Sequence, residues 1–526
     1  MPASISLLPP ELLSLIFEVG VWSDPFPDRF AAWHRVTDGS DPSFDRRTPL
    51  LHHYDPEFRM TVGQVSKTWK SVRDATPRLW TRIEVVYDTV GKAPPQTLMW
   101  LLKRSGALPL DIRLACASSE RSSETTFDSL SRSWIILTQA LTQVLGILQH
   151  SIPRWRSFHL TARTRSEAYS TLVQFRQPAL QLEELRITAQ DMGATVQALT
   201  SRAHFPPLPP LFGSRTPKLR SVVLEPFAVN IDIQMMTNLR SIRLDGGWVT
   251  QSQLLRALGA NRGLEELSLV TVDFQDALWS AYQEVGPDIN IVLPCLHTLK
   301  LEAPRSSMVS LLSRLTVPSL TSLALCRTEE FDEDVDEEEA VAPSTAAVLR
   351  ILANARRAGH LPLRFFSLTY GSVWEANAEQ GEEGTNDALT AFLGLVDSLE
   401  TLKVHNYSHH PSTLLQVGSE PLRPDENDIP VCPALRHLHI SQCEGTQRGA
   451  VRRFVESRLH GLGDDQAISS PCRFAELDSL VIEAESGKVV CGLDDIRWIK
   501  ARVPHFRVDQ SSAMVHSRWI DYDDED

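Results

Sequence analysis

From residue 155 onward the chain repeats a short hydrophobic pattern: an apolar residue, two variable residues, a second apolar residue, one variable residue and a third apolar residue. The alternation that ends each copy is typical of a β-strand with one buried face. A weaker copy precedes them between Leu108 and Leu114. The sequence therefore predicts eleven or twelve short strands. The eleven clear copies are Trp155-Phe158-Leu160, Leu182-Leu185-Ile187, Leu219-Val222-Leu224, Leu239-Ile242-Leu244, Leu264-Leu267-Leu269, Leu296-Leu299-Leu301, Leu320-Leu323-Leu325, Phe365-Leu368-Tyr370, Leu399-Leu402-Val404, Leu435-Leu438-Ile440 and Leu477-Leu480-Ile482.

The spacing of these copies indicates how the strands are connected. Successive copies end 20 to 45 residues apart, and leucine-rich repeats have about 20–29 residues. The longer intervals leave room for helices, which the patterns at 250–258 and 344–358 predict. A unit of one strand and one return helix cannot bury its apolar side alone, so such units stack into a curved parallel sheet with outer helices. A doubly wound α/β domain also alternates strands and helices, but it does not explain eleven copies. The predicted fold is an α/β leucine-rich-repeat solenoid over residues 91–510.

Residues 1–90 lie outside this repeat and have helical patterns. Apolar residues at 12, 13, 16 and 17 predict one helix after Pro9 and Pro10, and a second helix is predicted over 62–74, before Pro77. Two or three short helices have little interior, so Trp69 and Trp80 are expected to dock on the repeats or on a partner. Six basic residues between 58 and 83 oppose one acid and would favour an acidic partner surface: Arg59, Lys67, Lys70, Arg73, Arg78 and Arg82.

Three blocks of this region resemble an F-box and occur in the expected order. They are Leu8-Pro9-x-Glu11-Leu12-Leu13-x-x-Ile16-Phe17, Val65-Ser66-Lys67-x-Trp69-Lys70 and Pro77-Arg78-Leu79-Trp80-x-x-Ile83. The form is similar to that of the F-box and leucine-rich-repeat proteins of mushroom-type fungi, in which a segment like 100–106 commonly follows the box. Two features depart from the family pattern. Ser66 stands where the family frequently has Cys, and the insert at 18–62 is longer than the common spacing.

The resemblance implies a three-helix domain that docks on the SKP adaptor of a cullin-RING ubiquitin ligase, and through it on a cullin scaffold, while the repeats hold a protein substrate. A purely structural cap for the solenoid is the alternative for this block. A scaffold without a ubiquitin-ligase role is the alternative for the whole chain. Carried over residue by residue, the adaptor contacts fall on Leu8, Pro9, Leu12, Ile16, Val65, Trp69, Leu79 and Trp80.

Composition and charge limit the classes of partner and the cellular compartment that we expect. The 526 residues include 52 basic and 66 acidic side chains, a formal charge of −14, which argues against nucleic acid as the partner of the whole surface. The sequence contains no run of about 18 apolar residues, so no membrane span is predicted. Glu11 interrupts the N-terminal segment where a secretory signal would be apolar, so no such signal is predicted. The seven cysteines contain no CxxC pair and are expected to be unlinked thiols. The expected location is the cytoplasm or the nucleus.

Candidate chemistry is sparse, so the sequence predicts neither an enzyme nor a cofactor or metal site. The phosphate-binding, dinucleotide-binding, nucleophile-elbow and HExxH motifs are all missing. His405, His409 and His410 are expected in an exposed loop, and a zinc site from Cys432 and Cys443 with the histidines between them is disfavoured because the thiols would lie outside the strand.

Two acidic segments are expected to be solvated: 329–339, with nine acids in eleven positions, and the tail within 511–526. A calcium-binding loop in the first segment would need Gly at its sixth position and Glu at its twelfth position. Glu337 and Pro343 occupy these positions, so a calcium site is not predicted.

The residues between the apolar positions of each strand should point away from the interior of the solenoid. They are mostly long and mixed in charge, which suits a polar protein partner better than an apolar ligand. The expected substrate-binding residues are Arg186, Arg243, Glu266, Lys300, Lys403, His437, His439 and Glu483.

Overall fold

The computed structural model describes residues 8–22, 58–87, 95–116, 139, 141–162, 164–189, 211–225, 237–245, 251–270, 290–327, 345–357, 359, 361–369, 382–405, 432–443, 449–460, 475–484 and 491–509. The acidic segments at 329–339 and 511–526, residues 23–57 of the predicted insert, and His409 and His410 lie outside the described residues.

The fold is α/β, with a parallel sheet of fourteen strands in which neighbours in space follow one another in sequence. Two short strands, β8 (Ile291–Val292) and β10 (Leu315–Thr316), form a separate pair. The strands of the long sheet are, in order, β1 (Arg82–Tyr87), β2 (Leu110–Cys116), β3 (Trp155–Ala162), β4 (Glu184–Ala189), β5 (Ser221–Glu225), β6 (Ser241–Asp245), β7 (Glu266–Val270), β9 (Thr298–Ala303), β11 (Ser322–Arg327), β12 (Phe365–Thr369), β13 (Thr401–His405), β14 (His437–Cys443), β15 (Ser479–Ala484) and β16 (His505–Asp509).

The predicted strands are confirmed. In ten of the eleven clear copies the last two apolar residues lie on a strand of the long sheet, and the weaker copy at 108–114 overlaps β2. The copy at 365–370 overlaps β12 but was placed two residues too late, because Phe366 and Leu368 align with Leu323 and Leu325 of β11, and Tyr370 lies outside the described residues. The pattern did not predict β1 or β16, the first and last strands in the sheet order. Because β1 begins at Arg82, the sheet starts inside the region predicted to be purely helical.

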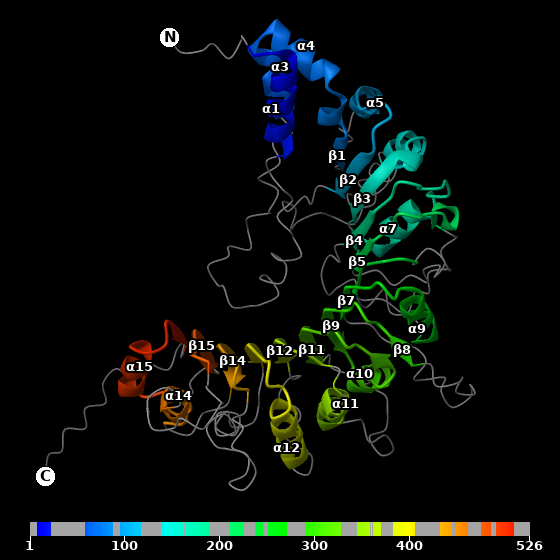
Figure 1. Ribbon diagram of the computed structural model, residues 1–526. Helices are drawn as coiled ribbons and strands as arrows, with labels where there is room; N and C mark the ends of the chain where they lie inside the picture. Colours follow the sequence, from blue (N-terminus) through cyan, green and yellow to red (C-terminus); the bar gives the residue numbers. More distant parts are fainter. Residues whose placement is uncertain are drawn as a thin grey trace, which may run out of the picture. The chain divides into compact units, whose positions relative to one another are not determined.

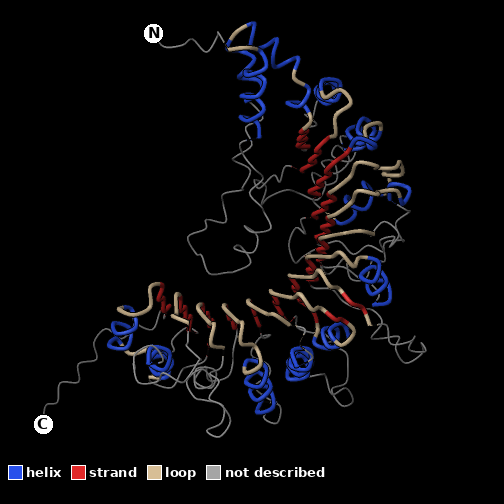
Figure 2. The backbone as a smooth tube through the Cα atoms, viewed as in Figure 1, coloured by secondary structure: helices blue, strands red, loops and turns tan. Residues whose placement is uncertain are grey.

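Contacts within the chain group it into two units, residues 1–201 with 208–219 and residues 202–207 with 220–526. In the second unit the helices α9 to α12 lie on the same side of the strands (Figures 1 and 2). The helices are α1 (Pro10–Trp22), α3 (Phe58–Val65), α4 (Lys67–Ala75), α5 (Pro95–Arg104), α7 (Arg165–Leu172), α9 (Gln251–Ala260), α10 (Arg305–Leu312), α11 (Thr345–Arg357), α12 (Glu382–Leu393), α14 (Ala450–His460) and α15 (Leu493–Lys500), with 3-10 turns η2 (Pro77–Trp80), η3 (Ile152–Arg154) and η4 (Leu211–Ser214).

The second helix of the N-terminal region is two helices, whereas the sequence predicted one over 62–74. Ser66 separates α3 from α4 because its backbone is extended, with φ −159° and ψ 166°. Its Oγ accepts a hydrogen bond from the backbone N–H of Trp69 at 3.1 Å, which satisfies one of the unpaired donors at the start of α4. Ser66 is therefore the N-cap of a new helix.

Apolar residues of the repeat form continuous buried columns across the sheet. In the second unit the strand register aligns one apolar residue per strand, and each member of this column is at most 2% exposed. Burial of one such side chain contributes about 1.5–3 kcal/mol, so the stacked column stabilises neighbouring repeats together. The column is Leu267, Leu299, Leu323, Phe366, Leu402, Leu438 and Leu480.

One backbone contact recurs at the start of the strands of the second unit. A carbonyl oxygen just before one strand accepts hydrogen bonds from two consecutive N–H groups at the start of the next strand, at 2.7–3.2 Å. The carbonyls belong to Arg220, Arg240, Glu265, His297, Thr321, Arg364, Glu400 and Arg436. Because each carbonyl holds two successive amides, it fixes the register in which the next strand begins.

The core of the first unit is anchored by Trp155, which is fully buried. Its ring stacks on Phe158 with centroids 4.6 Å apart and meets Phe175 edge-on at 5.1 Å. Its indole Nε1 donates to the Oγ of Ser151 at 3.0 Å, so both the apolar and the polar part of the side chain are satisfied.

We expect Trp155→Ala to lower the free energy of unfolding by about 3–5 kcal/mol, because it leaves a cavity among close-packed rings. Urea unfolding followed by far-UV circular dichroism measures this loss. Leu180→Ala is the control, since Leu180 is 46% exposed. A Trp155→Ala variant no less stable than the Leu180→Ala variant would contradict this account of the core.

Candidate functional site

Helices α1, α3 and α4 and the turn η2 form a small helical domain, which we call the helical box (residues 8–22 and 58–80). Leu13 and Phe17 of α1 are 0% and 1% exposed, and the Phe17 ring lies 5.1 Å from the ring of Trp69 in α4. A hydrogen bond of 2.9 Å joins the hydroxyls of Ser14 and Thr76. One side of α1 is therefore fixed to the rest of the box.

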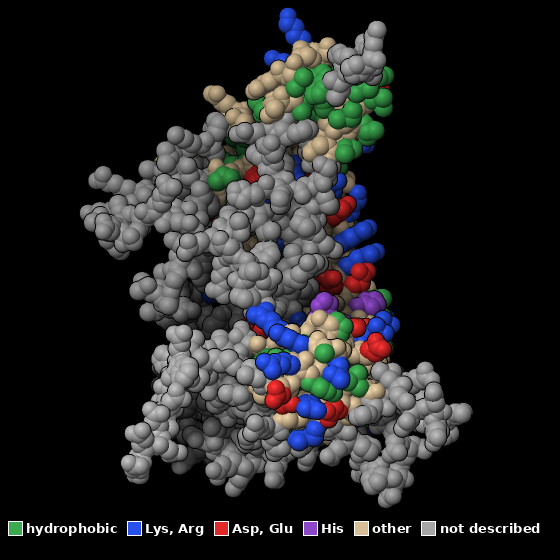
Figure 3. Space-filling model, turned by 90° about the vertical axis from the view of Figure 1, so that its left-hand side faces the viewer, with side chains coloured by type: hydrophobic (Ala, Val, Ile, Leu, Met, Phe, Trp, Pro, Cys, Tyr) green, Lys and Arg blue, Asp and Glu red, His purple; other side chains and the backbone are tan. Residues whose placement is uncertain are grey.

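The other side of α1 is also apolar, and it faces solvent. Leu12, Leu15, Ile16 and Val19 are 43–56% exposed, and their spacing places them along one helical stripe. We call these four residues the exposed stripe. Two residues of α3, Met60 and Val65, are 48% and 57% exposed. Figure 3 shows the hydrophobic side chains gathered over the helical box. An apolar helix side left in water is typical of a partner-binding surface.

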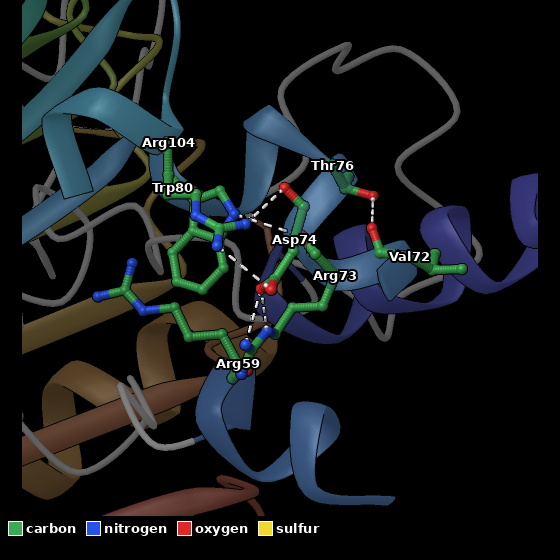
Figure 4. A network of polar contacts seen from close by, with 7 residues as sticks. All are labelled: Arg59, Val72, Arg73, Asp74, Thr76, Trp80 and Arg104. Carbon is green, nitrogen blue, oxygen red and sulfur yellow. Dashed lines mark hydrogen bonds and ion pairs between the residues drawn. The ribbon is translucent and has the colours of Figure 1, made fainter. Parts of the chain in front are cut away.

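An acidic residue at the end of α4 joins the box to the first repeat (Figure 4). Asp74 Oδ1 lies 2.7 Å from Nη2 of Arg73, and Asp74 Oδ2 lies 3.2 Å from Nη2 of Arg104 in α5. Nη1 of Arg104 also donates to the backbone carbonyl of Asp74 at 2.9 Å. Arg73 is 6% exposed, and burying a guanidinium requires such a paired carboxylate.

Trp80 lies at the centre of the same network and is fully buried. Its Nε1 donates to the carbonyl of Arg73 at 3.3 Å, and the guanidinium carbons of Arg59 and Arg73 each lie 5.6 Å from its ring. Trp100 of α5 meets it edge-on at 4.8 Å. Nη1 of Arg59 donates to the carbonyl of Arg82 in β1 at 3.1 Å, so the box is tied to the strand as well as to the helix of the first repeat.

Gly63 leaves the space that the Arg73 side chain occupies. A Cβ at position 63 would lie 2.0 Å from Nη1 of Arg73, so a larger residue would displace the guanidinium from Asp74. This requirement could not be seen in the sequence pattern, because Gly63 and Arg73 are ten residues apart and on different helices.

Two of the eight predicted adaptor contacts differ from the prediction. Leu79 and Trp80 are 1% and 0% exposed, so they form the interior of the first unit and are withdrawn as contact residues. The turn η2 that carries them packs against α1 and α5, and Trp100 of α5 meets the ring of Trp80, which the helical pattern of residues 1–90 could not show. The other six are at least partly accessible: Leu8, Pro9, Leu12, Ile16, Val65 and Trp69.

The predicted basic patch is also smaller than expected. Arg59 and Arg73 are 7% and 6% exposed and are engaged inside the box. Arg78 is exposed and lies 3.4 Å from Glu18. Lys67 and Lys70 are exposed on α4, so the basic character of the box surface is concentrated there.

The second candidate surface is the polar face of the sheet, the side on which the residues between the buried columns lie. The strand register aligns these residues in rows across the sheet. All eight predicted substrate-binding residues lie on strands, at positions that alternate with buried ones. Arg186 lies on β4 in the first unit, and the other seven lie in the second unit.

Two of these eight are less accessible than predicted. Arg243 is 9% exposed because its Nε lies 2.9 Å from Oε1 of Glu225 on the neighbouring strand. His439 is 8% exposed, with its Nε2 3.6 Å from Oε2 of Glu483. Pairing across the sheet therefore covers residues that single-strand alternation places in solvent.

His405 is the last residue of β13 and not part of a loop, as the sequence had suggested. Its Nδ1 lies 2.5 Å from Oγ of Ser441 on β14, and its ring meets that of His439 edge-on at 5.1 Å. Among the described residues, no group of three or more His, Cys, Asp or Glu side chains is placed to hold a metal ion. None of the described helices is long and apolar enough to cross a membrane.

Glu302, on the polar face, lies in surroundings that disfavour its charged form. Burial raises the pKa of Glu302, and the nearby charge of Asp245 raises it further, while Lys300 and Arg243 oppose the shift. On the next strand, burial and Glu302 raise the pKa of the Cys326 thiol to about 11, so this cysteine is a weak nucleophile near neutral pH.

No model of a known protein family matches the chain, and no curated protein matches it. The resemblance of residues 8–83 to an F-box therefore stays a prediction.

We expect Asp74→Asn to lower the free energy of unfolding by about 1–3 kcal/mol, because the buried Arg73 loses a charged hydrogen-bond partner. Thermal unfolding measures the loss. Asp494→Asn is the control, because the Asp494 side chain is 95% exposed and its pair with Arg497 is solvated. Equal melting temperatures for Asp74→Asn and the wild type would show that the network contributes no stability.

Glu302→Gln should stabilise the protein at neutral pH. A carboxyl whose pKa is higher in the folded than in the unfolded state costs stability at pH values above the folded pKa, and the cost disappears as the pH falls below the unfolded pKa. The variant should therefore have the higher melting temperature at pH 7.5, and the difference should shrink towards pH 4.5. A variant that is less stable at pH 7.5 would overturn this interpretation.

Proposed function

We propose that this chain is the substrate-recognition subunit of a cullin-RING ubiquitin ligase. In this proposal the helical box docks on an SKP adaptor, and the polar face of the repeats binds a protein substrate. The observation that carries the proposal is the exposed stripe of α1, an apolar surface on a helix whose opposite side is already packed.

The physical case for docking rests on where apolar side chains remain in water. The exposed large apolar residues of the described chain number ten, and six of them lie in the helical box. Removing a Leu or Ile side chain from water contributes about 1.5–3 kcal/mol, so covering the exposed stripe would supply binding energy. Lys67 and Lys70, exposed on α4, would favour an acidic partner and increase the association rate.

This chain would bring a substrate close to the other bound proteins and would not itself catalyse a reaction. Two binding surfaces on one chain raise the effective concentration of the substrate near a second bound protein. The Asp74 and Trp80 network supports this role, because it holds the helical box against α5 and β1 and so limits the freedom of whatever the box binds relative to the first repeat. Productive transfer depends on such restricted geometry.

The box also covers the first strand, as the alternative of a structural cap requires. Arg59 donates to the carbonyl of Arg82 in β1, and Trp80 packs against Trp100. A cap needs only the buried side of the box, however. The exposed stripe contributes nothing to capping, which is why we favour docking.

Replacing Leu12 and Ile16 together by Glu should weaken binding to a purified SKP adaptor by about 100-fold or more, since two apolar anchors are lost. Isothermal titration calorimetry measures the affinity. Leu180→Glu is the control, because Leu180 is as exposed as the stripe but lies outside the box. Circular dichroism of the double variant checks that α1 remains folded.

Unchanged adaptor affinity in the folded double variant would reject the docking surface. Ubiquitin transfer separates the ligase from a scaffold that binds an adaptor without a ligase role. In a reconstituted ligase, the wild-type chain should support ubiquitination of its captured partner, and the Leu12 and Ile16 double variant should not.

A further inference from the structure

Glu302 differs from most acidic residues on the polar face, because it has no direct partner among the described residues. It forms no hydrogen bond and no ion pair with any of them, and only charges at longer range act on it. Six other acidic residues of this face form an ion pair or a hydrogen bond with a basic side chain, a histidine or a hydroxyl group. They are Glu84, Asp111, Glu184, Glu225, Glu266 and Glu483.

The strand register places uncharged side chains on both sides of this carboxylate. Glu302 lies on β9, and its neighbours at the same level are Val270 on β7 and Cys326 on β11 (Figure 1). With a pKa of about 11, the Cys326 thiol is neutral near neutral pH. Arg243, a cation that acts on Glu302 from β6, already forms an ion pair with Glu225. The attraction of the surrounding cations does not outweigh burial, so the pKa of Glu302 remains raised.

Lys300 lies on the same side of β9, two residues before Glu302. It also forms no hydrogen bond or ion pair with the described residues, and its neighbours at the same level are Ser268 and Ala324. Positions two apart on a strand are separated by about 6.6 Å. Strand β9 therefore presents a positive and a negative group at the spacing of an extended chain, and we call Lys300 and Glu302 the β9 charges.

The position of Glu302 is unfavourable for the isolated chain. Removing a carboxylate from water without a hydrogen-bonded or charged partner costs free energy of folding, which is why Glu302→Gln is expected to stabilise the protein. Groups that reduce stability in this way are typical of functional sites. A cation brought by a binding partner would stabilise the ionised form of Glu302. The arrangement therefore favours a partner that carries a positive charge opposite this residue.

We propose that Glu302 binds an arginine side chain of the protein held on the polar face, while Lys300 binds an acidic side chain two positions away in the same extended segment. This proposal rests on the assignment of the polar face as the substrate-binding surface. Side chains on one side of an extended segment recur about every 6.6 Å, which matches the spacing of the β9 charges. A segment with an arginine and an acidic residue two positions apart can therefore meet both charges at once.

Arginine fits this position better than lysine, and a protein fits it better than a nucleic acid. The guanidinium group is planar and weakly hydrated, and it pairs with a carboxylate through two parallel hydrogen bonds. The lysine ammonium is more strongly hydrated and would lose more on entering a half-buried site. A nucleic acid would bring phosphates to Lys300, but the carboxylate of Glu302 would repel them.

The test compares two short capped serine peptides that each contain one arginine and one glutamate. In the first peptide these residues are two positions apart, and in the second they are adjacent, so that they point to opposite sides of an extended chain. Both peptides are neutral, so general attraction to a chain of formal charge −14 is the same for both. Saturation-transfer difference NMR with the full chain at low ionic strength gives the affinity and shows whether the arginine δ-methylene protons contact the protein. We expect the first peptide to bind about fivefold more tightly.

Glu302→Gln should weaken binding of the first peptide by about fivefold, and Lys300→Gln should also weaken it, because each variant loses one charged contact. The matched control is Glu476→Gln, which removes one exposed carboxylate three residues before β15. It changes the net charge equally and should retain the affinity within about twofold. Because Glu302→Gln is expected to be the more stable protein, a loss of binding in this variant cannot be attributed to unfolding.

Equal affinities for the two peptides would overturn the proposal, and so would equal effects of Glu302→Gln and Glu476→Gln. A peptide with lysine in place of arginine should bind more weakly, and equal binding would overturn the assignment to arginine. Adaptor affinity is measured in parallel, because docking uses the helical box and not β9. Equal binding of the peptides by a chain that binds the adaptor rejects this inference alone. The expected difference between the peptides, in a chain that does not bind the adaptor, rejects the docking proposal alone.

Discussion

The recurrent backbone contact at the strand starts is the constraint on which the second unit depends. One carbonyl accepts two successive N–H groups from the next strand, and eight carbonyls from Arg220 to Arg436 do so in turn. A one-residue slip would exchange the buried and the exposed side of a whole strand. Fixing the register at each start therefore keeps every leucine in its buried column, and it aligns the residues of the polar face in rows. The intervals between the copies vary from 20 to 45 residues, yet the same backbone contact recurs at the strand starts.

This alignment explains why residues far apart in sequence act together. Arg243 and Glu225 are paired only because two strands start in register, and the same holds for His439 and Glu483. Cross-strand pairs of opposite charge contribute to sheet stability, but they also remove side chains from the surface that is available to a partner. The described part of the polar face therefore contains locally compensated pairs.

The sequence predicted the strands well because a buried strand position tolerates little other than an apolar side chain. The hydrophobic pattern did not predict the first and last strands of the sheet order, β1 and β16. In β16 the alternation has only Phe506 and Val508, and both are half-buried, so the pattern is weak where burial is weak. β1 was missed because Ile83 follows Trp80 closely and was attributed to the helical region. The split between α3 and α4 depends on the extended backbone of Ser66, whereas the spacing of Val62, Val65 and Trp69 fits a continuous helix. The sequence could not assign Trp80 to the interior, because Trp100, which packs against it, belongs to a later helix.

The helical box is a second case in which the sequence pattern could not show which apolar residues are buried. Helix α1 has neighbouring apolar residues that differ in burial. Leu13 and Phe17 are buried, whereas Leu12 and Ile16 are about half exposed. Helical periodicity alone cannot make this division, since the four residues form one broad apolar arc. Packing decides it, because the ring of Trp69 covers Phe17. A helix with this composition needs cover on two sides, and the described chain provides it on one. The second side is exposed to water in the described chain, and a partner that bound it would also stabilise the folded box, because binding to the folded state alone adds to its stability.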